Sequence, residues 1–219
     1  MNLIEEFWIP VKLSLEIASV SALAVFILGT LFAKWMSRLR FRGKVILETI
    51  LLLPLVLPPT VVGFLLIIIF GNQSPIGQVI ESLFQQSIMF TWWAALIAAT
   101  IVAFPLMYQS AKIGFQTVDI EIEHAARMEG ASDWRVFFYI TLPLSLKSII
   151  SGVILSFARA LGEFGATFMF AGNLPGKTQT IPIAVYVAFE SGDLTLAWMW
   201  VISIVIISFI MLLISTVIK

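Results

Sequence analysis

Two side chains of opposite charge, Arg159 and Glu163, stand four residues apart in a long apolar stretch. On a helix this spacing places both on one face, where they can neutralise each other. Charged groups in a membrane-like environment are costly unless they are paired or hydrated, and they often mark a functional site. Two interpretations stay open: a structural ion pair between helices, or a pair that lines a translocation path or its gate.

A second apolar stretch is interrupted by the prolines Pro54, Pro58 and Pro59. Proline lacks a backbone donor and its ring clashes with the preceding turn, so we expect this helix to kink or unwind. Unwound backbone inside a membrane is tolerated only against protein or a water-filled cavity. The prolines therefore indicate either a static kink that aids packing or a helix that bends around a path for a solute.

Several kinds of chemistry lack their usual residues. The chain has no cysteine, and His124 is its one histidine, so disulfides, thiolate metal sites and nucleophile–base catalysis are disfavoured. No loop of the full form Gly, four residues, Gly-Lys-Ser/Thr is present, and the segment from Gly172 to Lys177 matches it only in part, so ATP hydrolysis by that route requires another polypeptide. We expect no catalytic residue, no metal site and no cofactor bound by this chain, and an intramembrane enzyme is a disfavoured alternative.

Composition points to lipid as the solvent of this chain. Of 219 residues, 60% are hydrophobic and 12% charged, and the mean hydropathy is +1.03. A soluble domain is about 45–50% apolar and about 25% charged. Basic and acidic residues cancel to a net charge of zero, which gives no electrostatic reason to expect a nucleic-acid partner.

Five apolar stretches are long enough to cross a bilayer as helices. The sequence thus predicts an all-α polytopic membrane protein with a single transmembrane domain over residues 13–218, preceded by a short external segment, residues 1–12. No internal repeat supports the alternative of a secondary transporter. The predicted spans cover residues 13–33, 45–70, 90–111, 144–170 and 196–218.

Basic residues predict the orientation. Positive charge gathers in cytoplasmic loops, and residues 34–44 alone hold five of the thirteen basic side chains. With alternating spans, one side carries these together with Lys112, Arg127, Arg135, Lys147 and Lys219. The other side carries Glu5, Glu6, Glu81, Glu190, Asp193 and Lys177. We therefore expect the N-terminus outside and the C-terminus in the cytoplasm.

The cytoplasmic connection between the third and fourth spans, residues 117–143, is too patterned for a linker. Asp119 is a good N-cap for one short helix, and Gly130 stands where glycine ends a helix. A second short helix should follow and end near Thr141, before Pro143. The pair predicts either surface helices resting against the membrane or a docking element for a soluble partner.

This connection resembles the signature loop of ABC-importer permeases, which reads Glu-Ala-Ala, three residues, Gly, nine residues, Ile-x-Leu-Pro. His124 occupies the glutamate position, with Glu123 one residue earlier. The other positions match in type and spacing: Ala125, Ala126, Gly130, Ile140, Leu142 and Pro143. In that family the loop is the coupling helix, which sits in a cleft of the cytoplasmic ATPase.

The chain is similar over nearly its whole length to the molybdate branch of these permeases. Four segments carry the likeness: residues 53–59, 136–144, 157–167 and 175–182. Sulfate permeases share the Leu-Gly-Glu-Phe-Gly segment, residues 161–165, but are usually longer, so sulfate or thiosulfate is the alternative cargo, with tungstate close to molybdate in size and charge.

The resemblance implies a set of partners. They are two copies of an ATPase subunit that binds ATP and Mg, a second copy of this chain, an extracytoplasmic binding protein, and the lipid of a bacterial or archaeal cytoplasmic membrane. It implies transport by alternating access, with the connection over residues 117–143 acting as the coupling lever.

Overall fold

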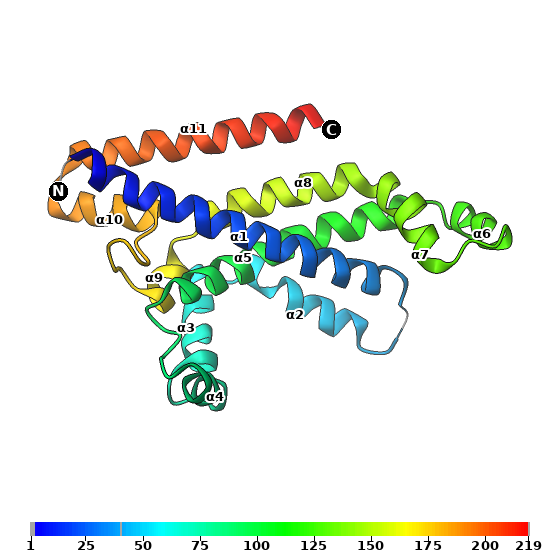
Figure 1. The fold of residues 1–219 in the computed structure, drawn as a ribbon, viewed down its shortest axis with the longest axis horizontal. Coiled ribbons are helices and arrows are strands. Elements are labelled where there is room, and N and C mark those ends of the chain that lie inside the picture. Colours follow the sequence, from blue (N-terminus) through cyan, green and yellow to red (C-terminus); the bar gives the residue numbers. More distant parts are fainter. Residues whose placement is uncertain (1–2, 40, 219) are drawn as a thin grey trace.

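The computed structural model describes residues 3–39 and 41–218, and within these ranges every regular element is a helix (Figure 1). The predicted all-α class is thus confirmed. Arg40 and Lys219, used above to predict sidedness, lie outside the described residues, as do residues 1–2 of the expected external segment.

Three long helices form the centre of the bundle: α1 (Leu3–Arg38), α5 (Trp92–Thr117) and α8 (Leu142–Leu161). Small residues at the α5–α8 crossing let the two backbones approach closely. A Cβ atom added to Gly152 would lie 2.7 Å from Cβ of Ser110, and one added to Gly114 would lie 2.8 Å from Cβ of Ser148. The pair α5–α8 therefore has little freedom to slide.

The first helix is longer than the apolar stretch that predicted it. α1 extends beyond residues 13–33 at both ends and begins with Glu5 and Glu6 in its first turn. Arg38 stands in its last turn. Acidic residues at the start and a basic residue at the end both favour the helix dipole, which helps the helix continue past the apolar segment.

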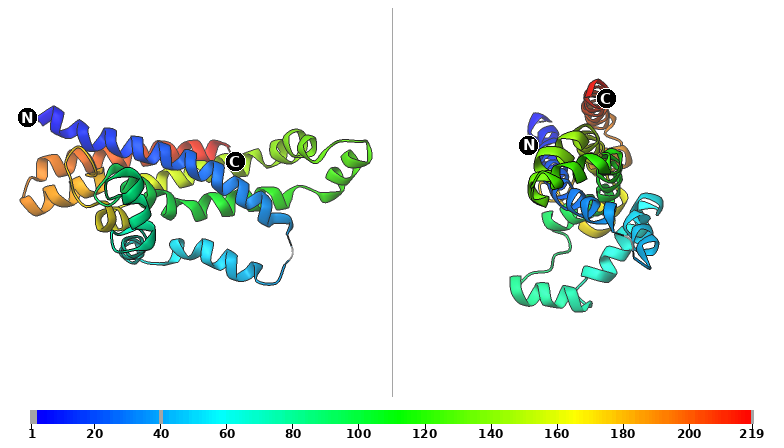
Figure 2. Two further views of the ribbon diagram at one scale, coloured as in Figure 1. Left: turned by 60° about the horizontal axis from the view of Figure 1, so that its bottom comes forward. Right: turned by 90° about the vertical axis from the view of Figure 1, so that its right-hand side faces the viewer.

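The second predicted span, residues 45–70, is broken. α2 (Lys44–Val56) and α3 (Pro59–Phe70) meet at a bend of 119°. The predicted interruption by proline is confirmed, although α2 continues through Pro54 and the break falls at Leu57 and Pro58. In two views α3 and the following α4 (Pro75–Phe84) project sideways from the long axis of the bundle (Figures 1 and 2).

The fourth predicted span, residues 144–170, contains an interruption that the sequence analysis did not predict. α8 ends at Leu161, and the short α9 (Gly165–Ala171) follows after residues 162–164. No proline marks this break, but a glycine stands on each side of the segment Glu163–Phe164.

The connection over residues 117–143 holds α6 (Ile120–Met128), α7 (Asp133–Val136) and the π-helical turn η1 (Phe137–Thr141). The expectation that the second short helix ends near Thr141 is wrong, because α7, η1 and α8 form one helix from Asp133 to Leu161. In η1 the N–H of Leu142 donates to the Phe137 carbonyl. This wider turn accommodates Pro143, whose ring would clash with a regular α-helical turn.

The remaining helices are α10 (Ile181–Ser191) and α11 (Leu194–Ile218). Of the most apolar part of α11, 11% is buried within the chain, so most of this helix faces lipid or a partner. Among the described residues, four helices are long and apolar enough to cross a bilayer, and the α2–α3 pair makes up to five. The start of α1 and helix α6 lie at opposite ends of the long axis (Figure 1). The predicted orientation stays a prediction.

Candidate functional site

The element α6–α7 begins and turns as its residue types predict. The Asp119 carboxylate accepts a hydrogen bond from the Glu121 N–H at 2.9 Å and so caps α6. Gly130 has φ +91°, a left-handed conformation that glycine adopts without strain. Ser132 precedes the first residue of α7 but makes no side-chain capping bond.

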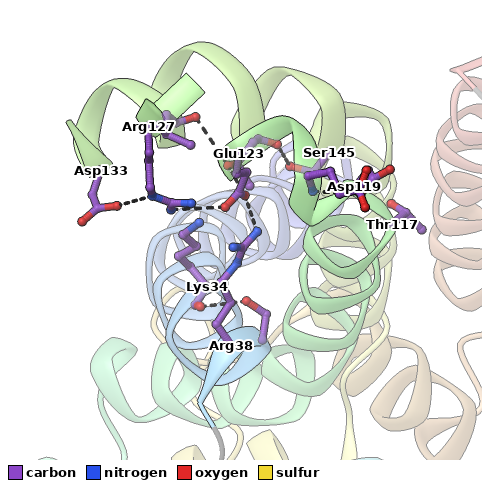
Figure 3. A network of polar contacts seen from close by, with 12 residues as sticks. Lys34, Arg38, Thr117, Asp119, Glu123, Arg127, Asp133 and Ser145 are labelled. Carbon is purple, nitrogen blue, oxygen red and sulfur yellow. Dashed lines mark hydrogen bonds and ion pairs between the residues drawn. The ribbon is translucent and has the colours of Figure 1, made fainter. Parts of the chain in front are cut away.

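A buried carboxylate, Glu123, is the centre of this element (Figure 3). Its side chain is 0% exposed, and both oxygens have partners. One oxygen pairs with Arg38 of α1 and accepts a hydrogen bond from Thr141 Oγ1 at 2.6 Å. The other pairs with Arg127 Nη2 at 3.3 Å. Because a buried charge is stable only when it is paired and hydrogen-bonded, these contacts fix the position of α6.

The charges around Glu123 extend the network toward the surface. Arg127 Nε donates to the exposed Asp133 carboxylate at 2.8 Å, and this hydrogen bond raises the pKa of the guanidinium. Lys34 Nζ lies 4.9 Å from the centre of the Phe137 ring, within the range of a cation–π interaction. Arg127 therefore stays charged, and α1, α6 and η1 meet around one ionic cluster.

The residues at the positions of the signature pattern divide into two groups. His124, Ala125, Gly130 and Pro143 are exposed, whereas Ala126, Ile140 and Leu142 are partly buried. Glu123 points inward and His124 outward. The acidic side chain next to the motif is thus held within the chain.

The outer surface of α6, α7 and the adjoining η1 carries exposed apolar and aromatic side chains. Met128 is 90% exposed, Tyr139 80% and Trp134 73%, and the Trp134 and Phe138 rings stack with centroids 5.8 Å apart. Ile122 is also exposed. Such a group of exposed apolar side chains on a protruding element is typical of an interaction surface.

The two helix breaks pack against each other, which neither motif alone predicted. A Cβ added to Gly165, at the start of α9, would lie 2.9 Å from Cβ of Pro59 and 3.2 Å from the Thr60 nitrogen. One turn further along α3, a Cβ on Gly63 would lie 2.7 Å from Cβ of Met169. Glycine at 63 and 165 thus lets α3 and α9 meet closely. Pro58 and Pro59 are exposed beside this contact, and Pro54 is partly buried within α2.

The charged pair lies at the second of these breaks. Arg159 Nη1 is 2.7 Å from Glu163 Oε2, and the side chains are 29% and 1% exposed. The other Glu163 oxygen accepts a hydrogen bond from the Ala166 N–H at 2.8 Å, in the first turn of α9. Glu163 therefore both neutralises Arg159 and caps the helix that follows the break.

Sequence reasoning missed a third polar cluster, between α2 and α5. Glu48 accepts hydrogen bonds from Lys112 Nζ at 2.6 Å and from Tyr108 Oη at 3.0 Å. Its partners are 60 or more residues away in sequence, so no local spacing reveals the contact.

This arrangement of helices is shared with chains of solved ABC transporters. A chain of a bacterial alginate ABC transporter, solved in complex with a periplasmic protein, superposes with a TM-score of 0.75 at 16% identity, over 96% of this chain and 77% of that chain. A chain of the inward-facing MetNI methionine ABC transporter gives a TM-score of 0.72 at 14% identity, with each chain covered over 100% of its length.

The chain belongs to the family of binding-protein-dependent transport system inner membrane components, whose model matches residues 25–219. YvgM of Bacillus subtilis (strain 168), whose name assigns it provisionally to a molybdenum transport system, is 62% identical over 94% of this chain and 91% of its own length. ModB of Escherichia coli (strain K12), a molybdenum transport system permease protein, is 44% identical over 98% and 94%. The sulfate transport system permease protein CysW of Synechococcus elongatus is 33% identical over 87% and 65%.

Proposed function

We propose that this chain is the permease subunit of an ATP-driven importer that carries molybdate across the cytoplasmic membrane. The observation that carries the proposal is the identity of 62% and 44% to two proteins named for molybdenum transport, over more than nine-tenths of each chain. The sulfate relative is less similar, and the match covers 65% of its length. In this proposal the N-terminus is outside and α6 is in the cytoplasm.

The element α6–α7 docks on the ATPase subunit, which holds ATP and Mg. Its exposed Met128 and Trp134, with Tyr139 of the adjoining η1, supply an apolar surface for that contact. Two ATPase copies would engage two copies of this chain, one each. The tight α5–α8 packing supports a lever action, because α5 leads into α6 and α8 continues from α7.

The translocation path runs beside the two helix breaks, between two copies of the chain. Arg159 is partly exposed there and neutralised by the buried Glu163. A passing oxyanion therefore meets a weakened positive charge, which attracts it without holding it. Selection of molybdate then rests mainly on the extracytoplasmic binding protein, and this chain supplies a path that opens to each side in turn.

Uptake of labelled molybdate tests the proposal. Cells without their own carrier would express this chain with its neighbouring ATPase and binding protein, and unlabelled tungstate or sulfate would compete. We expect tungstate to block uptake and sulfate to leave it unchanged. Block by sulfate would assign the chain to the sulfate branch, and absence of ATP-dependent oxyanion uptake by an assembled complex would refute the cargo.

A further inference from the structure

Helix α6 is held to the rest of the chain by charge rather than by apolar packing. Ile120, Ile122 and Met128 are exposed. All residues of α6 lie in the described part of the chain, and of these Glu123 is the buried one. A helix without a buried apolar face needs another source of attachment. The ion pairs and the hydrogen bond of Glu123 provide it.

Each partner of Glu123 belongs to a different part of the fold. Arg38 ends α1, Arg127 belongs to α6 itself, and Thr141 ends the π-helical turn that continues into α8. One carboxylate thus joins the docking helix to two helices that cross the membrane.

Both of these helices lead toward a helix break. Helix α1 ends at Arg38, and the next helix along the chain is α2, which ends at Val56, two residues before Pro58. From Thr141 the chain passes along α8 to the Arg159–Glu163 pair. A displacement of α6 that pulls on Glu123 therefore reaches both of the breaks that pack against each other.

We propose that Glu123 is the positioning residue that transmits movement of α6 to α1 and α8, through its contacts with Arg38 and Thr141. This inference rests on the proposed function and adds an internal route from the ATPase to the path. It differs from a docking role, because the carboxylate is inaccessible to a partner. Without the charge, α6 would still bind the ATPase but would move without carrying the membrane helices with it.

The variant Glu123→Gln tests this, with Glu121→Gln as the matched control. Glu121 lies on the same helix and carries the same charge, but it is exposed. The complex with the ATPase would be reconstituted in lipid vesicles with the binding protein and molybdate. Assembly, ATP hydrolysis and molybdate uptake would be measured together.

We expect Glu123→Gln to assemble normally and hydrolyse ATP, but to import about tenfold less molybdate per ATP, since losing a charge-assisted hydrogen bond changes an equilibrium by roughly this factor. Glu121→Gln should keep the wild-type ratio. A ratio in Glu123→Gln within about twofold of wild type, or an equal loss in Glu121→Gln, would overturn the proposal.

The variant Arg38→Gln gives an independent test, because it leaves Glu123 paired with Arg127. If the two residues act through one contact, the double variant should be no worse than Glu123→Gln alone. If the loss of uptake per ATP in the double variant equals the product of the losses in the two single variants, the proposal is overturned. Loss of assembly in both single variants would also overturn it, because it would mean a purely structural role. The wild-type complex could instead hydrolyse ATP in response to a binding protein that carries another solute, and import no molybdate. That result would refute the proposed cargo. The role of Glu123 could still be measured as uptake of that other solute per ATP.

Discussion

Replacing Glu163 by alanine removes two interactions at the break between α8 and α9. The ion pair with Arg159 is lost, and so is the acceptor for the Ala166 N–H. Glutamine at the same position keeps an oxygen that can accept from Ala166 but removes the charge. The two variants therefore separate the ion pair from the helix cap.

The expected sizes follow from burial. An unsatisfied buried N–H costs about 1–3 kcal/mol, and breaking a buried ion pair by removing one partner costs about 3–5 kcal/mol. Arg159 is 29% exposed, so water recovers part of that loss. We expect Glu163→Gln to destabilise the chain by about 1–2 kcal/mol and Glu163→Ala by about 3–5 kcal/mol.

Thermal unfolding of the purified chain in detergent measures the difference. For a chain of this size 1 kcal/mol corresponds to about 2–4 °C in the melting temperature. Glu163→Ala should therefore melt roughly 10 °C below wild type, and Glu163→Gln roughly 5 °C below it. Glu16→Ala is the control, because Glu16 is exposed and its contact with Lys12 spans 3.7 Å. Equal melting temperatures for the two Glu163 variants would refute the capping role, and a wild-type value for alanine would refute both roles.

Gly152→Leu should destabilise the α5–α8 packing by about 1–3 kcal/mol, because an added Cβ lies 2.7 Å from a neighbouring side chain; Gly162→Ala, whose added Cβ has its nearest neighbour at 3.6 Å, should melt as wild type. Tyr108→Phe should lower the free energy of unfolding by about 1 kcal/mol, since it removes one partly buried hydrogen bond between α2 and α5. An unchanged melting temperature would contradict this. The hydrogen bond from Tyr186 to the Glu190 carboxylate raises the pKa of the phenol by stabilising its protonated form. Glu190→Gln should return that pKa toward its ordinary value in a titration of phenolate absorbance, and an unmoved titration would argue against the contact.

Features set by local spacing were predictable from the sequence. The Asp119 cap, the glycine turn at Gly130 and the break at Pro58 each depend on residues within one or two turns. The ion pair of Arg159 and Glu163 also follows from a helical spacing, although Glu163 lies just beyond the end of α8.

Features set by tertiary packing were not predictable in this way. Arg38 and Glu123 are far apart in sequence, and no local pattern around either residue predicts that the two form an ion pair. Beyond the break after Leu161, Gly165 approaches Pro59 closely, a contact that exists only in the folded chain. Glu123 was singled out for its place beside a motif, whereas its importance in the structure comes from complete burial.

The π-helical turn of residues 137–141 also changes the phase of the helix that contains it. One extra residue in a turn rotates everything before it by about 100° around the helix axis, relative to a regular α-helix. Apolar residues spaced at the regular α-helical period from α7 into α8 therefore do not lie on one face of the combined helix. Deleting a single residue here would restore the regular α-helical period. The Trp134 side chain would then point in a different direction around the helix axis, relative to α8. We therefore expect one-residue insertions or deletions to be less tolerated here than in the exposed loop at residues 174–177.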